Sequence, residues 1–223
     1  MFGSTGKSIV DVMSYMSEAF RYERDLSLYC KEKYVTKVSV AKDSGELRLA
    51  GYEPIADVPY LIFDLADGDI RDIISFNGKM DNILLFKSLH SIAVGLKQLH
   101  TIKIKHNDLK PSNVLVFGEE HKVGDLGSST CSTISGPHDD EVFAGDWNYA
   151  PPEILYNYVL PDQDKRAVLI DLYLVGSMFA FYFTGFSMST MLLKNLPEQF
   201  NLKTWTGNFD QVKDYLLEAF SLH

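Results

Sequence analysis

Four polar residues in the middle of the chain have the types and spacing to act on a phosphate group. Residues 106–115 read HNDLKPSNVL, where Asp108 is a candidate base for a hydroxyl proton and Lys110 a candidate cation for a phosphate. Asn113 and, after a short β-like run, Asp125 offer the oxygen ligands that Mg²⁺ prefers. Phosphoryl transfer requires these groups, because it depends on neutralised charge and on atoms held in line.

Length and composition indicate an ordinary globular chain. Its 223 residues, 46% of them hydrophobic, fit one large domain or two small ones. A net charge of −9 argues against binding to nucleic acids or anionic membranes. The two cysteines, Cys30 and Cys131, suit a reducing compartment, although one disulfide between them stays open. The start of the chain lacks the pattern of a signal peptide, so we expect a cytoplasmic protein.

An uncharged run over residues 172–193 is long enough to span a bilayer. The alternative is a buried helix of a globular domain that breaks at Gly185. Polar residues interrupt the second half of the run, and Asp171 precedes it. We therefore favour the buried helix and predict no membrane span.

Hydrophobic periodicity predicts the elements that position these groups. We expect helices over residues 11–32, over 81–100 with Asp81 as N-cap, and from about 168. We expect strands over residues 34–41, 47–50, 60–63, 114–117 and 122–124, with a turn at 43–45. Strands dominate early and helices late, which indicates an α+β fold.

Four motifs in the expected order resemble the eukaryotic-like Ser/Thr protein kinase family. Residues 106–113 resemble its H-R-D-L-x-x-x-N catalytic loop, and residues 125–127 its D-F-G. Residues 151–153 resemble its A-P-E element, and residues 171–176 the D-x-[WY]-x-x-G start of its central helix. The resemblance implies a bilobal α+β fold, with an incomplete small lobe and hinge over 1–66 and a mainly helical large lobe over 67–223. It also implies ATP, Mg²⁺ and a protein substrate.

The resemblance assigns a role to each candidate residue. Asp108 would accept the proton and Lys110 would contact the γ-phosphate, while Asn113 and Asp125 would hold Mg²⁺. Asp171 would bind the main chain of the catalytic loop. The residues that would line the nucleotide site are Asp64, Leu65 and Ala66 at the hinge, Leu115 under the adenine, Phe63 as gatekeeper, and Glu23 on the regulatory helix.

Several departures from the family pattern bear on activity. No G-x-G-x-x-G occurs, and no V-A-I-K-like lysine precedes Glu23. In the family an arginine late in the large lobe holds the A-P-E glutamate, but the last arginine of this chain is Arg166. We expect Glu153 to be a buried carboxylate, so that either Lys213 pairs with it or the natural domain continues beyond the chain. Asn107 replaces the usual arginine, which argues against control by loop phosphorylation. Asp146 replaces a threonine and brings a carboxylate toward Asp108, either anchoring Lys110 or repelling the base.

Three functions stay open at this point. The first is a Ser/Thr protein kinase domain, which we expect to be weakly active or inactive as a fragment cut at both ends. The second is a pseudokinase that acts as a binding scaffold. The third is a small-molecule phosphotransferase. The A-P-E-like residues 151–153 and the helix that begins at Asp171 argue against it, because in the kinase family these elements build a platform for a protein substrate.

Overall fold

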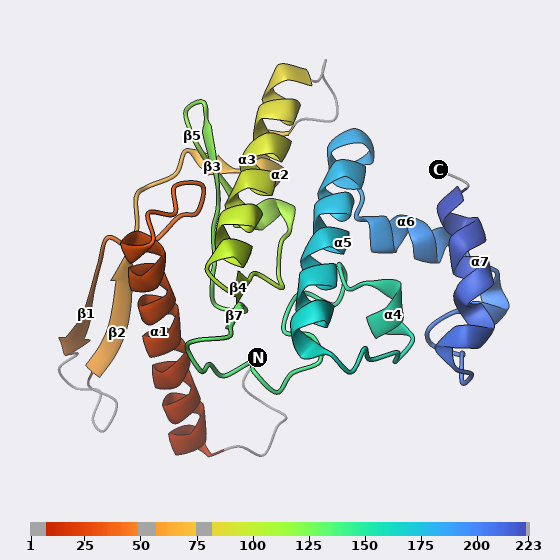
Figure 1. Ribbon diagram of the computed structural model, residues 1–223, viewed down its shortest axis with the longest axis horizontal. Coiled ribbons are helices and arrows are strands. Elements are labelled where there is room, and N and C mark those ends of the chain that lie inside the picture. The colour runs from red at the N-terminus through yellow and green to blue at the C-terminus, as the bar shows by residue number, and fades with distance from the viewer. Residues whose placement is uncertain (1–7, 49–56, 75–81, 222–223) are drawn as a thin grey trace.

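The computed structural model of the protein describes residues 8–48, 57–74 and 82–221, which form helices and three small sheets (Figure 1). In chain order the elements are α1 (Ile9–Glu32), β1 (Asp43–Arg48), β2 (Asp57–Ile62), β3 (Gly68–Asp69), α2 (Ile70–Ile73), α3 (Asn82–Thr101), β4 (Ile104–Lys105), η1 (Pro111–Asn113), β5 (Val114–Phe117), β6 (Glu120–Val123), β7 (Thr130–Cys131), α4 (Pro152–Leu155), α5 (Gln163–Thr184), α6 (Met188–Asn195), η2 (Glu198–Phe200) and α7 (Phe209–Ser221). The architecture is α+β, as the sequence predicts.

The first helix begins at a capping box. The hydroxyl of Ser8 accepts a 3.1 Å hydrogen bond from the Asp11 main-chain N–H, and the Asp11 carboxylate accepts one of 3.0 Å from Ser8. Leu26 and Cys30 are fully buried on the inner face of α1. The helix predicted over residues 11–32 is therefore confirmed.

The strand predicted over residues 34–41 is wrong. This segment makes one parallel bridge, between Val38 and Val123, next to the sheet β3-β5-β6. The N–H of Ser39 bonds the Val123 carbonyl at 2.7 Å, and the Val123 N–H bonds the Lys37 carbonyl at 3.0 Å. These two bonds attach the segment to β6 without a longer ladder.

The turn predicted at residues 43–45 is also wrong, because these residues begin β1. β1 pairs with β2 in an antiparallel hairpin in which Gly45 lies opposite Tyr60. A β-carbon at Gly45 would lie 2.5 Å from the Tyr60 hydroxyl oxygen. The glycine therefore makes room for an aromatic ring across the hairpin.

The central sheet and its covering helix lie close to the predicted positions. β5 has the predicted bounds, and β6 begins two residues earlier than expected, after a turn in which Gly118 has φ 59°. α3 packs on β6, and its buried residues recur at helical spacing. Asp81, the predicted N-cap of α3, lies outside the described residues.

α5 packs beside α3 through one face, on which Leu174, Met178 and Tyr182 are fully buried (Figure 1). It ends at Gly185, as predicted, with the left-handed φ of 80° that favours glycine. Its other face is exposed, and Phe183 keeps 53% of its surface. Over the described residues, α5 is the only helix long and apolar enough to cross a membrane. Its packing on α3 favours the interpretation as a core helix.

Two hydrophobic clusters hold the elements together. The larger one joins α1, α3, α5 and the central sheet, and the smaller one joins α6, η2 and α7. The hairpin β1–β2 and α1 lie at one end of the molecule, and α7 at the other (Figure 1). The division of the chain at residue 66 stays a prediction.

Candidate active site

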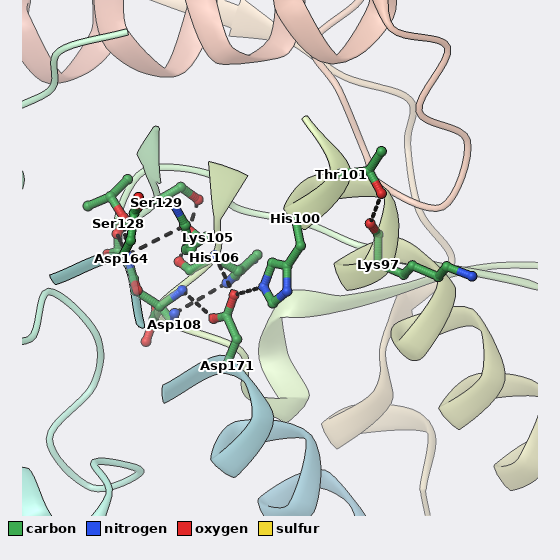
Figure 2. A network of polar contacts seen from close by, with 12 residues as sticks. Lys97, His100, Thr101, Lys105, His106, Asp108, Ser128, Ser129, Asp164 and Asp171 are labelled. Carbon is green, nitrogen blue, oxygen red and sulfur yellow. Dashed lines mark hydrogen bonds and ion pairs between the residues drawn. The ribbon is translucent and has the colours of Figure 1, made fainter. Parts of the chain in front are cut away.

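The carboxylate of Asp171 fixes the main chain of the 106–113 segment. Asp171 is fully buried in α5, and its two oxygens accept hydrogen bonds from the N–H groups of His106 (2.9 Å) and Asn107 (2.7 Å). Nε2 of His100, on α3, lies 2.6 Å from Oδ2 of the same carboxylate (Figure 2). The expected contact between Asp171 and this main chain is therefore confirmed. The contact with His100 was not predicted, because the two side chains are 71 residues apart in sequence.

His106 links the two segments that carry the candidate residues. Its ring is fully buried, with Nε2 at 2.9 Å from the carbonyl oxygen of Gly124. Its Nδ1 accepts a 3.2 Å hydrogen bond from the Asp108 N–H. Both ring nitrogens of His106 are therefore engaged with main-chain groups, which leaves neither free to act as a base.

Asn107 holds the chain that follows Asp125. It is buried, with a left-handed φ of 62°, a conformation that Asn tolerates better than most residues. Its side-chain Nδ2 donates to the Thr130 hydroxyl at 3.1 Å and to the Ser128 carbonyl at 3.3 Å. In place of the family arginine, this chain therefore has a neutral side chain committed to local hydrogen bonds.

Asp108, Asn113 and Lys110 meet at one carboxylate. Nδ2 of Asn113 donates to the Asp108 main-chain oxygen at 2.8 Å and to its Oδ2 at 3.1 Å. The ammonium of Lys110 lies 2.9 Å from the same Oδ2. Asp108 and Asn113 are both buried, at 7% and 6% exposure. With Nδ2 committed to Asp108, Asn113 keeps its Oδ1 as a candidate ligand for Mg²⁺.

Lys110 carries its positive charge among several carboxylates. Burial on its own lowers the pKa of Lys110, but the hydrogen bond and charge of Asp108 raise it. The charges of Asp146, 3.7 Å away, and of Asp125 raise it further, so that the net pKa lies above its ordinary value. The lysine is fully protonated at neutral pH. Of the two effects proposed for Asp146, the structure shows the anchoring of Lys110.

Asp125 lies close to this group at the end of β6. The Gly124 N–H donates a 2.8 Å hydrogen bond to the Asn113 carbonyl, which sets the position of the next residue. The Asp125 side chain is exposed, and Oδ1 accepts a 3.1 Å bond from the Gly127 N–H. From the sequence, a positive φ is expected at Gly127, because glycine adopts it without strain, but the residue that has it is Asp125, at 61°. An Asp side chain that bonds the main chain two residues later stabilises this conformation.

Glu23 of α1 faces the Asp125 segment. Burial, followed by the negative charge of Asp125, raises the pKa of the Glu23 carboxyl above its ordinary value. A β-carbon placed on Gly127 would lie 4.0 Å from its Oε2. No cation pairs with Glu23 within residues 8–48, 57–74 and 82–221.

The predicted nucleotide-lining residues lie on two neighbouring segments. Leu115, half-buried on β5, packs on Gly124, where an added β-carbon would lie 2.9 Å from its Cδ1. Ala66 is half-buried between β2 and β3, and the next residue, Asp67, donates a 2.8 Å hydrogen bond to β5. Asp64 is exposed and forms an ion pair with Lys42. Their roles toward a nucleotide stay predictions.

Glu153 does not need a buried partner. Its side chain is exposed on α4, contrary to the expected buried carboxylate. Glu153 and Lys213 line the same cavity of about 250 Å³, but the described residues include no ion pair between them. Exposure to water removes the cost that burial of the charge would carry.

Both cysteines are free and buried. Burial, with a smaller effect of the Cys131 charge, raises the pKa of the Cys30 thiol to about 12. The disulfide that the sequence left open is not formed. Cys30 is therefore an unreactive thiol at neutral pH.

Comparison with known proteins places these residues in a family. The family profile described as "Protein kinase domain" matches residues 15–210 of the chain. The chain is 29% identical over 175 residues to mitogen-activated protein kinase 2 of Arabidopsis thaliana. The matched region covers 78% of this chain and 44% of that protein. It is 33% identical over 129 residues to mitogen-activated protein kinase 5 of the same plant, and this matched region covers 57% of this chain and 32% of the relative.

A rice protein gives a similar result. Mitogen-activated protein kinase 4 of Oryza sativa subsp. japonica is 27% identical over 175 residues, which is 78% of this chain and 45% of that protein. The chain thus spans less than half the length of these relatives. The profile match extends through α1, the central sheet and α5 to the start of α7. It therefore includes every candidate residue of the site.

Proposed function

The chain belongs to the protein kinase domain family, and from this membership we propose that it binds ATP with Mg²⁺ and transfers the γ-phosphate to a serine or threonine of a protein. The observation that carries the proposal is the convergence on Asp108. Lys110 and Asn113 bond its carboxylate, and the Asn113 carbonyl positions Gly124, next to Asp125. A base, a cation and two oxygen donors thus lie together.

The residues have distinct parts in the proposed reaction. The substrate hydroxyl oxygen forms a bond to the γ-phosphorus, the bond to the bridging oxygen of the leaving ADP breaks, and Asp108 takes the hydroxyl proton. Lys110 neutralises charge on the transferred group. Asn113 Oδ1 and the exposed Asp125 carboxylate form a donor set that fits Mg²⁺, which neutralises phosphate charge when bound. Leu115 and the main chain of residues 64–66 are the proposed adenine contacts.

We propose low turnover for this chain alone. The sequence has no glycine-rich loop, and Glu23 has no cation partner in the described ranges, so that phosphate positioning rests on few groups. This observation also favours a second candidate function, a pseudokinase scaffold that binds nucleotide weakly or not at all. The two free thiols support the proposed cytoplasmic location.

A thermal-shift titration with MgATP tests the nucleotide site. We expect a rise in the melting temperature that is lost in Asp125→Ala, since this change removes a proposed Mg²⁺ ligand, and kept in Asp214→Ala, an exposed α7 residue. Absence of any shift in the unmodified protein would favour the scaffold. Transfer of labelled γ-phosphate to peptides, but not to aminoglycosides or choline, would separate a protein kinase from a small-molecule phosphotransferase.

A further inference from the structure

A second carboxylate is held beside the proposed base. The main-chain N–H of Asp146 donates a 2.7 Å hydrogen bond to Oδ1 of Asp108. Oδ1 of Asp146 accepts hydrogen bonds from the main-chain N–H and the side-chain amide of Asn148, at 3.0 and 2.9 Å. Its Oδ2 lies 3.7 Å from the ammonium of Lys110. These contacts fix the Asp146 carboxylate next to the point where a hydroxyl would meet Asp108.

The charges at this point do not cancel. Asp108 and Asp146 carry two negative charges, and Lys110 supplies one positive charge, which leaves the trio at −1. The side chain of Asp146 is 30% exposed, against 8% for Asp108 and 22% for Lys110, so Asp146 is the most accessible of the three. The positive charge of Arg71 also reaches the neighbouring Tyr149. The Arg71 guanidinium lies 3.7 Å from the Asp69 carboxylate, which offsets the charge of the arginine.

We propose that Asp146 determines specificity by favouring a substrate with lysine or arginine directly beside the acceptor serine or threonine. The inference rests on the proposed function, because Asp108 as base sets where the acceptor lies. Consecutive Cα atoms are about 3.8 Å apart, so a residue next to the acceptor brings its side chain near Asp146. A basic neighbour there gains an ion pair, whereas an acidic neighbour meets a like charge. Engagement of Lys110 by a phosphate would strengthen this preference.

Binding of two unreactive peptides tests the inference without nucleotide or turnover. The fluorescein-labelled probes are Gly-Ala-Lys-Ala-Lys-Ala-Gly and Gly-Ala-Glu-Ala-Glu-Ala-Gly, in which the central alanine replaces the acceptor. By fluorescence polarisation at low salt, we expect the lysine peptide to bind about three- to fivefold more tightly, the range of a partly exposed ion pair. Asp146→Asn should abolish the difference, because the trio becomes neutral while the main-chain bond to Asp108 stays.

Asp214→Asn is the matched control, since it removes the same charge from an exposed position on α7. It should keep the preference for the lysine peptide. Equal binding of the two peptides, no binding of either at millimolar concentration, or a preference that survives in Asp146→Asn would overturn the inference. The proposed function has a separate readout, the MgATP thermal shift of the same protein, so that either idea can fail alone.

Discussion

The carboxylate of Asp171 accepts a 2.9 Å hydrogen bond from the main-chain N–H of His106, a residue 65 positions earlier in the chain. Because Asp171 belongs to the long helix α5, the conformation of the candidate site depends on a helix that contributes no group to the proposed chemistry. The main-chain N–H groups of His106 and Asn107 belong to buried residues, so solvent water cannot take the place of the Asp171 carboxylate as their acceptor.

Replacing Asp171 by alanine should therefore destabilise the fold strongly. Two buried main-chain N–H groups would lose their acceptor, and each unsatisfied group costs about 1–3 kcal/mol, so we expect a loss of about 2–6 kcal/mol in the free energy of unfolding. Urea titration followed by circular dichroism measures the loss. Asp214→Ala, on the exposed side of α7, is the control and should change stability little. Similar stabilities of the two variants would contradict the role of Asp171.

Substitutions at Asn107 should separate backbone strain from lost hydrogen bonds. Asn107→Ala removes the bonds to Ser128 and Thr130 and keeps a β-carbon at φ 62°, a strained conformation that alanine tolerates less well than asparagine. Asn107→Gly loses the same bonds without that strain, so it should be about 1 kcal/mol more stable than the alanine variant. Thermal denaturation of both variants measures the difference. An alanine variant as stable as the glycine variant would show that the conformation relaxes.

The candidate site was predictable because its residues are close in sequence. Asp108, Lys110 and Asn113 belong to one short segment that ends in the 3₁₀ turn η1, so their spacing already brings them together. Asp125 follows β6, the strand paired with the β5 that begins directly after Asn113. The amphipathic pattern of α3 similarly has a local cause, since one face of the helix packs on the sheet.

The errors arise where distant residues decide the local conformation. Glycine is common in turns, which is why the sequence predicts a turn at Gly45. In the structure Gly45 lies in β1, where the absence of a β-carbon leaves space for the ring of Tyr60 on the paired strand. The left-handed conformation falls on Asp125 and not on Gly127, because the Asp side chain bonds the main chain two residues later. The contact of His100 with Asp171 leaves no sign in the spacing of either segment.

The carboxyl of Glu23 should make stability depend on pH. Its pKa is raised by burial and by Asp125, so the folded state binds this proton more tightly than the unfolded state, and stability falls as the pH rises above the ordinary value of 4.5. Glu23→Gln should then stabilise the protein at pH 7, because glutamine removes the charge that burial and the neighbouring Asp125 disfavour. The gain should shrink as the pH falls and vanish below 4.5, where both states are protonated. Urea titrations from pH 7 to pH 4 measure it, and a gain independent of pH would contradict this account.

The ion pair of Lys105 with Asp164 should respond unequally to loss of either partner. The Lys105 ammonium is buried and also donates a 2.8 Å hydrogen bond to Ser132, whereas the Asp164 side chain is 72% exposed. Asp164→Ala leaves a buried cation with one hydroxyl, and we expect a loss of about 1–3 kcal/mol, less than for a fully buried pair because water screens Asp164. Lys105→Met fills the same space without a charge and should stay within about 1 kcal/mol of the unmodified protein.

The double variant Lys105→Met with Asp164→Ala completes this comparison as a thermodynamic cycle. Once the ammonium is gone, the carboxylate has no buried charge to neutralise, so the alanine change should cost little in the methionine background. Free energies of unfolding from urea titrations of the four proteins give the coupling between the two side chains. If Asp164→Ala costs the same with and without Lys105, the two charges are uncoupled, and the hydrogen bond to Ser132 alone stabilises the buried ammonium.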